Sequence, residues 1–317
     1  MKKNIGILLK LFIAIFLLGY ILLTHDISKI ISHLLNIPLL LWGFVFLLMV
    51  VQVIISVVVF MLFMPNQTFL SLLYVRLVSF AYGFILPGQL ATEGVRAYLL
   101  GKDEKSFGQS SAAVALNKII TVIVLLFLGT VGLIFAGSLG YILIYVFVIA
   151  GIVLTLMLFS LASLFFYNRI NRLLLFLSQR VAGFGKFFNV LAQMAEHWHG
   201  YTRNIGLMVK VFLFVLLFQL SVAIIGVILS YGVGAEASFL EWLWINSVLT
   251  FVLILPISLG GIGIREGSLI GLLGQIGVEP EQALAVSFGF LALTIIQALA
   301  GIGMEIGLMI NKKEGGH

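Results

Sequence analysis

The sequence predicts an all-α integral membrane protein, and three observations favour that fold class. Of the 317 residues, 62% are hydrophobic and only 9% are charged, which is more apolar than a soluble domain requires. Several runs reach about 20 apolar residues, the length that crosses a hydrocarbon core of roughly 30 Å. Basic residues gather in alternate loops, the positive-inside pattern. We expect one polytopic domain over residues 1–317 in the plasma membrane, with both termini cytoplasmic.

Six segments have the length and apolar composition of full crossings. The first of them follows Met1-Lys2-Lys3 as a signal peptide would. It has no small-residue cleavage site and is long enough to span, so we interpret it as a membrane helix. The six expected crossings are residues 5–24, 38–63, 112–136, 139–166, 205–231 and 283–310.

Two further stretches, Phe69 to Gly101 and Phe239 to Gly277, each hold two shorter apolar pieces interrupted by proline and glycine. We expect each to fold back as a re-entrant helical hairpin, the first entering from the cytoplasm and the second from outside. With this arrangement every basic loop falls inside. Bent backbone at membrane depth must be buried in protein or line a wet cavity, so the hairpins should meet inside the bundle.

The two interruptions resemble each other in sequence. "FILPGQLATEGVRAYLLG" begins at Phe84 and "LILPISLGGIGIREGSLIGLLG" begins at Leu253, and their prolines, Pro87 and Pro256, are 169 residues apart. Each half of the chain can be written as two helices, a hairpin and one helix. Because the halves start on opposite sides, we expect an inverted repeat with halves of about 1–137 and 138–310, a common plan of secondary transporters.

The segment from 167 to 204 is the longest loop between expected crossings. It alternates basic and apolar residues, as in "NRINRLLLFLSQRVAGFGKFF". This pattern is typical of an amphipathic helix lying on an anionic cytoplasmic leaflet. We favour simple anchoring over a regulatory role, and we expect its counterpart in the first half, the loop from His25 to Ile37, to be shorter.

Few ionisable residues fall at membrane depth, where each is costly unless it is paired, solvated or functional. Glu93 and Arg96 are three residues apart and can pair on one helix face. Arg265 and Glu266 are adjacent, about 100° apart on a helix, so they should face different partners. Pairing Arg96 with Glu266 and Arg265 with Glu93 is one arrangement that satisfies all four. Three further candidates for the site are Arg76, Lys118 and Glu305.

The glycines after Pro256 indicate a second feature of the site. Gly260, Gly261 and Gly263 open a half-helix whose free N–H groups would suit a phosphate or carboxylate, and Arg265 would reinforce that end. The alternative is that these glycines only allow close helix packing and that Arg265 and Glu266 form a structural pair.

Other classes of site have weaker support. The chain has no cysteine, which excludes disulfides and thiol chemistry. His197 and His199 are two residues apart, off one helix face, so we expect no metal. We also expect no cofactor and no nucleic-acid partner. Lys118 could snorkel to the cytoplasmic surface, and the tryptophans near the ends of crossings are explained by interfacial anchoring. They are Trp42, Trp198, Trp242 and Trp244.

At the two hairpin motifs the chain resembles the transmembrane domain of the lysylphosphatidylglycerol synthase/flippase family. That family carries a Pro-x-x-x-Gly-Gly-x-Gly-x-Arg-Glu motif, matched here in full from Pro256 to Glu266. Its other motif is matched at Pro87, Gly88, Glu93 and Arg96, whereas Gln89, Ala91 and Thr92 replace glycines. The resemblance implies a domain that moves an aminoacylated phospholipid between leaflets. It also implies a soluble transferase domain, which we expect to be absent here.

These features favour a phospholipid translocator, or a translocator of a lipid-linked headgroup, over an enzyme. In this hypothesis the hairpin residues Pro87, Gly88, Pro256, Gly260, Gly261 and Gly263 surround the headgroup. Arg96 and Arg265 would neutralise its phosphate, while Glu93 and Glu266 would orient the arginines or contact a cationic part. One alternative is a membrane-embedded transferase, although the sequence supplies only isolated glutamates as catalytic groups at membrane depth. Another is a partner subunit of a separate lipid-modifying enzyme. The sequence is also compatible with a homo-oligomer.

Overall fold

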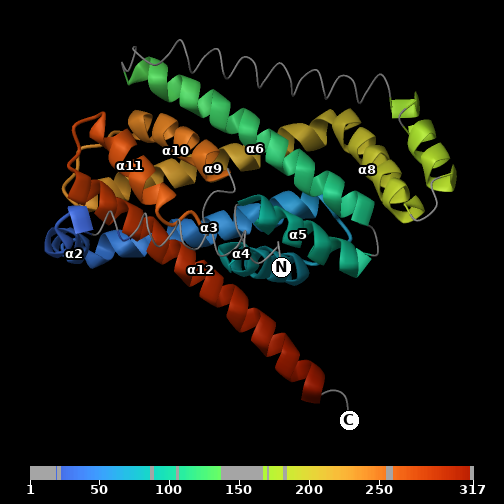
Figure 1. Ribbon diagram of the computed structural model, residues 1–317, viewed down its shortest axis with the longest axis horizontal. Coiled ribbons are helices and arrows are strands. Elements are labelled where there is room, and N and C mark those ends of the chain that lie inside the picture. Colours follow the sequence, from blue (N-terminus) through green and yellow to red (C-terminus); the bar gives the residue numbers. More distant parts are fainter. Residues whose placement is uncertain are drawn as a thin grey trace.

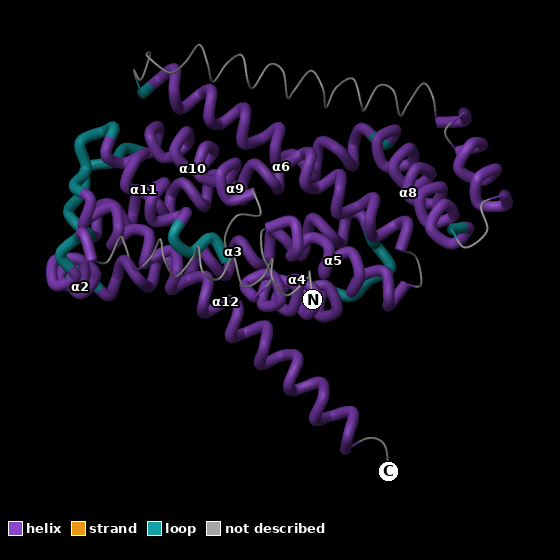
Figure 2. The backbone as a smooth tube through the Cα atoms, viewed as in Figure 1, coloured by secondary structure: helices purple, strands orange, loops and turns teal. Residues whose placement is uncertain are grey.

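The computed structural model describes Gly19 and residues 23–85, 89–104, 107–136, 167–169, 171–180, 184–254 and 260–314. Every regular element in these ranges is an α-helix (Figure 2), so the all-α prediction is confirmed for them. Most of the first expected crossing and all of the fourth, 139–166, lie outside the described residues. So do Pro87, Gly88 and Pro256.

Among the residues that the structure describes, four helices are long and apolar enough to cross a membrane. At 1.5 Å per residue, even the shortest, of 25 residues, is about 38 Å long and exceeds a hydrocarbon core of roughly 30 Å. They agree with four of the crossings expected from the sequence. These helices are α3 Leu39–Phe63, α6 Phe107–Phe135, α9 Ile205–Gly232 and α12 Pro280–Glu314.

Two pairs of shorter helices occupy the stretches expected to fold back. The first pair is α4 Phe69–Ile85 and α5 Gln89–Glu104, and the second is α10 Phe239–Ile254 and α11 Ile264–Gly274. In the first pair, Gly83 lies so close to Thr92 that a Cβ would overlap its hydroxyl, and Ser79 lies beside Arg96. Ser79 and Arg96 lie on either side of Gly83 and Thr92 in the sequence. Contacts in this order are the pattern of an antiparallel helical hairpin.

Two of the long helices each pack along one helix of a shorter pair. α12 lies along α4, and α6 lies along α10 (Figure 1). Glycines make both approaches possible. A Cβ on Gly301 would overlap the carbonyl oxygen of Leu77, and a Cβ on Gly132 would lie 2.6 Å from that of Leu240. The two helix pairs therefore lie between α6 and α12.

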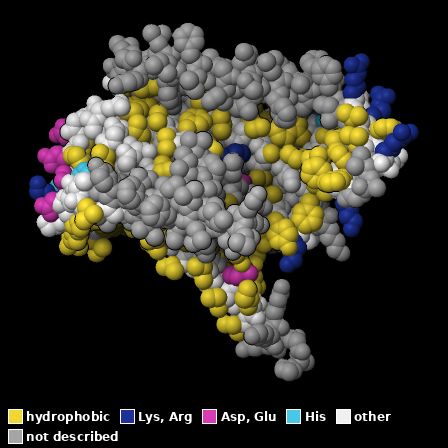
Figure 3. Space-filling view, viewed as in Figure 1, with side chains coloured by type: hydrophobic (Ala, Val, Ile, Leu, Met, Phe, Trp, Pro, Cys, Tyr) yellow, Lys and Arg dark blue, Asp and Glu magenta, His cyan; other side chains and the backbone are white. Residues whose placement is uncertain are grey.

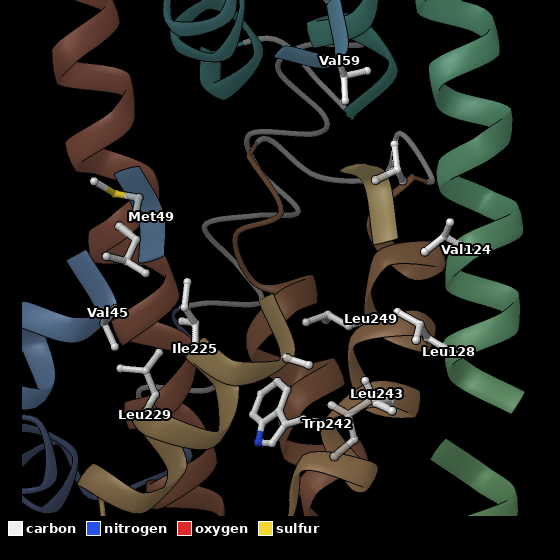
Figure 4. Packing of buried hydrophobic residues seen from close by; sticks show 14 of the residues in the cluster. Val45, Met49, Val59, Val124, Leu128, Ile225, Leu229, Trp242, Leu243 and Leu249 are labelled. Carbon is white, nitrogen blue, oxygen red and sulfur yellow. The ribbon is translucent and has the colours of Figure 1, made fainter. Parts of the chain in front are cut away.

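The core lies between the long helices and α10. Figure 4 shows Val45 and Met49 of α3 near Ile225 and Leu229 of α9. Further along the core, side chains of α10 face α6. Trp242 is fully buried because Gly226 leaves room for its ring, and its indole N–H donates to Ser230.

The prediction of interfacial anchoring is wrong for three of the four tryptophans. Trp198, Trp242 and Trp244 are buried inside the bundle. Their large apolar surface packs against helices that the sequence alone does not place beside them.

Two shorter helices flank the bundle. The expected loop after His25 contains α2 Ile27–Leu35, whose first N–H groups are capped by the Asp26 carboxylate. The amphipathic segment contains a helix over 171–180 and then α8 Gly185–Arg203. α8 packs on α6, and its Tyr201 hydroxyl donates to the Phe63 carbonyl at 2.9 Å. Membrane anchoring alone therefore does not describe α8.

The outer surface of the bundle is apolar, as a lipid environment requires. Large side chains such as Phe46, Leu213 and Leu299 are exposed, and Figure 3 shows hydrophobic side chains over much of the visible face. The C-terminal part of α12 extends beyond the other helices (Figure 1) and carries exposed Ile306 and Leu308. Together with the four long apolar helices, this surface identifies a membrane protein.

The close approach of α12 to α4 gives a test of the packing. We expect Gly301→Ala to lower the midpoint of thermal unfolding in detergent, because the added Cβ meets a backbone carbonyl that cannot rotate away. Overpacking of this kind costs about 1–3 kcal/mol. Gly303→Ala is the control, since a Cβ there has no atom within 4 Å and the gain in helix propensity is the same. Equal midpoints would contradict the packing.

Candidate functional site

Two adjoining cavities lie where the two helix pairs meet. The larger cavity, of about 270 Å³, opens between α3, α4, α5, α6, α9 and α10. The smaller cavity, of about 210 Å³, is lined by α4, α5, α10, α12 and the turn before α11. Phe80 and Thr92 line both cavities. Pockets for drug-sized ligands measure roughly 300–1,000 Å³, so each cavity suits a small polar group.

Glu93 and Arg96 form an ion pair on the wall of the larger cavity. The distance between the Glu93 carboxylate and Arg96 Nη1 is 3.0 Å, and the side chains are 19% and 7% exposed. Arg96 Nε also donates to the Ser79 hydroxyl at 3.4 Å, and its guanidinium lies over the ring of Phe60. The pairing expected from the three-residue spacing is confirmed. The alternative pairing of Arg96 with Glu266 is wrong, because the hairpin supplies its own partner.

Arg76 lies on α4 and lines the same cavity. One of its guanidinium nitrogens donates to the Gln297 side chain of α12 at 3.4 Å, and the guanidinium stacks on Phe80. Nε and Nη1 have no hydrogen-bond partner. Buried donors without partners are rare in folded proteins. Among the described residues, Arg76 has the most buried side-chain nitrogens without a hydrogen-bond partner.

The far end of the larger cavity is polar as well. Lys118 lies on α6, about 16 Å from the start of that helix, and lines the cavity. The cavity lining places Lys118 among the candidate site residues, as expected for a functional role. Asn246 donates to Gln219 at 3.2 Å, and both amides line the cavity although they are nearly buried. Neither amide was expected at the site from the sequence.

The turn before α11 brings the second helix pair against the first. Gly260, Gly261 and Gly263 have φ of 59°, 81° and 83°, values that residues with a Cβ rarely adopt. A Cβ on Gly260 would lie 3.2 Å from the ring of Phe84, at the end of α4. The glycines therefore serve both the turn and a close approach to the neighbouring hairpin.

Arg265 crosses back over this turn. Its Nη2 donates to the Gly260 carbonyl at 3.0 Å, its Nη1 has no partner, and it lines the smaller cavity. The expected pairing of Arg265 with Glu93 is wrong, since Glu93 is bound to Arg96. Arg265 is thus held by backbone, and its free donor stays available.

Glu266 has a different role from its neighbour. Its carboxylate accepts a hydrogen bond from the Gly263 N–H at 2.6 Å and one from the Ser287 hydroxyl of α12 at 3.0 Å. The side chain is fully buried and lines neither cavity. The expectation that Arg265 and Glu266 face different partners is confirmed. Glu266 caps α11 and ties it to α12, so it fixes the turn of the helix that carries Arg265.

A polar stripe on α12 supports both cavities. Ser287 binds Glu266, Thr294 lines the smaller cavity, and Gln297 binds Arg76. Glu305 accepts a hydrogen bond from the Tyr74 hydroxyl of α4, outside both cavities. Residues at spacings of three, four and seven share one face of a helix. This periodicity in an apolar run is the signal that could have identified Thr294 and Gln297 from the sequence.

Histidines do not contribute to the site. His199 stacks on the Tyr167 ring with centroids 4.4 Å apart. Within the part of the chain that the structure describes, no group of three or more His, Asp or Glu residues could hold a metal ion.

The capping role of Glu266 can be tested through stability. Glu266→Ala leaves the Gly263 N–H and the Ser287 hydroxyl without their buried acceptor. We expect this change to destabilise the protein by about 1–3 kcal/mol, seen as a lower thermal midpoint. Glu236→Ala removes an exposed carboxylate from the loop before α10 and serves as the control. A midpoint shared by both variants would show that Glu266 is not the cap.

The comparisons with known proteins place the chain in a family. A family model described as "Lysylphosphatidylglycerol synthase TM region" matches residues 7–301. This range contains both helix pairs and every residue that lines the two cavities. A search of curated proteins and a search of solved structures each found no match. The chain therefore belongs to the lysylphosphatidylglycerol synthase transmembrane-region family, and its function is a membrane function related to lipids.

Proposed function

We propose that this protein moves a phospholipid, or a lipid with a similar phosphate headgroup, between the two leaflets of the plasma membrane. The observation that carries the proposal is a set of buried cationic side chains, Arg76, Arg96 and Arg265, lining cavities where the two helix pairs meet. Charge inside an apolar bundle is retained at a cost and marks a path or site for a polar substrate.

In this proposal the protein has six crossings and two re-entrant hairpins in an inverted repeat of residues 1–137 and 138–310. The helix contacts support this repeat, because equivalent helices of the two proposed halves make equivalent contacts. α4 and α2 of the first half pack on α12, and α10 and α8 of the second half pack on α6. Arg96 and Arg265 are 169 residues apart, and so are Gly132 and Gly301. Equal spacing of a cavity arginine and of a packing glycine is expected if the two halves share one plan.

The charge distribution supports cytoplasmic termini. In Figure 3 the Lys and Arg side chains gather mostly at the end of the molecule near α8, whereas Asp and Glu side chains gather at the opposite end, near α2 and α11. Loops rich in Lys and Arg stay on the cytoplasmic side of a membrane. The α8 end is thus the cytoplasmic end in this proposal.

The headgroup enters the cavities while the acyl chains stay in lipid. Arg265 and Arg96 neutralise the phosphate, since guanidinium groups bind phosphate oxygens through charge-assisted hydrogen bonds. Glu93 orients Arg96, and Glu266 holds the end of α11 that carries Arg265. Phe80 and Thr92, which line both cavities, stand between the two positions of the headgroup. Rocking of one repeat against the other would expose each cavity in turn.

The proposed translocation has no covalent step. The carboxylate in the larger cavity, Glu93, is engaged with Arg96, so no observation favours the alternative of a transferase. A homo-oligomer, or a separate enzyme that modifies the lipid before or after transport, is compatible with translocation and forms no part of the proposed step.

Transport in liposomes tests the proposal. We expect Arg265→Ala and Arg96→Ala to slow the movement of a fluorescent phospholipid between leaflets by roughly tenfold or more. The reason is that a hydrogen bond to a charged group contributes about 1.5–3 kcal/mol. Arg203→Ala, at the exposed end of α8, should transport at the wild-type rate. Unchanged rates in both cavity variants would reject the proposal.

The topology can be measured independently by labelling. The chain has no cysteine, so single cysteines can be introduced without background. We expect Lys102→Cys and Arg203→Cys to react with a membrane-impermeant maleimide only from the cytoplasmic side. Glu236→Cys and Glu279→Cys should react only from outside, and all four positions are exposed. If Glu236→Cys and Glu279→Cys reacted from opposite sides, the proposed fold-back of the stretch between them would be wrong.

A further inference from the structure

The larger cavity carries more positive than negative charge. Arg76, Arg96 and Lys118 line it together with one carboxylate, that of Glu93. The formal charge of these side chains is therefore +2. Among the described residues no carboxylate lies within ion-pair distance of Arg76 or Lys118, because Glu93 is paired with Arg96. Two of the three cations are left for a ligand.

The donors in the cavity are also in excess. Arg76 is 8% exposed and uses one nitrogen on Gln297, while Nε and Nη1 have no partner. Thr92 and Asn117 add a hydroxyl and an amide group to the lining of the same cavity. A buried cation with unmet donors is costly until an acceptor with negative charge is bound. The natural ligand thus supplies several acceptor oxygens.

The smaller cavity has a lower formal charge than the larger one. Its one cationic side chain among the described residues is Arg265, which donates to the Gly260 carbonyl. None of these residues brings a carboxylate to this cavity, so the formal charge of its lining is +1. The two cavities therefore distinguish headgroups by charge, and the strongest selection belongs to the larger one.

Phosphate headgroups differ in the charge that they bring. A phosphomonoester carries about −1.5 to −2 at pH 7 and offers three terminal oxygens, whereas a phosphodiester carries −1. A headgroup that also bears an amine is less negative still. Its ammonium group would lie near the positive charges of Arg76 and Lys118 with no carboxylate of the described lining free to neutralise it. A dianionic terminal phosphate is the chemistry that best matches a cavity of charge +2.

Resting on the function proposed above, we infer that the preferred substrate is a lipid ending in a phosphomonoester or pyrophosphate, bound by Arg76, Arg96 and Lys118 in the larger cavity. Lys118 is the specificity-determining residue, because it adds the charge that a diester does not need. Arg76 and Arg96 bind the phosphate oxygens of either kind of headgroup. Inorganic phosphate shares this chemistry, so a test must separate the lipid from the free ion.

Binding to the full-length protein in phosphatidylcholine nanodiscs separates these cases. The probes are phosphatidic acid and phosphatidylglycerol with the same fluorescent acyl chain. We expect phosphatidic acid to bind at least about tenfold more tightly. Lys118→Met should abolish the preference, and Lys118→Arg should keep it because the charge remains. Lys210→Met, which removes a charge from the exposed face of α9, should leave it unchanged.

Three results would overturn the inference. One is equal affinity for the two lipids, another is a preference that survives Lys118→Met, and the third is displacement of phosphatidic acid by millimolar inorganic phosphate, which would identify a site for the free ion. A parallel transport assay keeps this inference distinct from the proposed function. Equal transport of both lipids would contradict the inferred selectivity but not the proposed translocation. Selective binding without any transport would contradict only the proposed translocation.

Discussion

The Glu266 carboxylate joins three parts of the molecule, and the arrangement of the site depends on it. By accepting hydrogen bonds from the Gly263 N–H and from Ser287, it fixes the first turn of α11 to α12. The glycine turn before α11 can then lie against Phe84 of the first hairpin, and Arg265 faces the smaller cavity. A buried carboxylate is costly alone, and two good donors offset that cost.

On the other side of the site, buried charges are likewise held by hydrogen-bonding partners. Arg96 is held by Glu93 and Ser79, all within one helical hairpin, whereas Arg76 reaches across to Gln297 of α12. α12 therefore contacts both helix pairs through polar side chains in an otherwise apolar run. A long helix that braces two hairpins can transmit a displacement of one to the other, which alternating access requires.

The sequence predicts local features well and contacts between distant segments poorly. The helices follow from hydropathy and length, and the pair of Glu93 and Arg96 follows from their three-residue spacing. The contact of Arg76 with Gln297 joins residues 221 apart in the chain, and no local pattern indicates such a contact. The cross-hairpin ion pairs were wrong for the same reason. The four charges were expected to pair across the hairpins, whereas Glu93 and Arg96 pair within one hairpin. A backbone carbonyl binds Arg265, and a backbone N–H and a serine bind Glu266.

A photoreactive lipid tests most directly whether the cavities hold a headgroup. A lipid with a diazirine next to its phosphate would be cross-linked to the protein in liposomes, and the modified peptides would be mapped by mass spectrometry. We expect the cross-links to fall on α4, α5, α6 and the start of α11, the segments that carry the cationic side chains of the two cavities. Cross-links confined to lipid-facing residues such as Phe46, Leu213 and Leu299 would contradict a headgroup site inside the bundle.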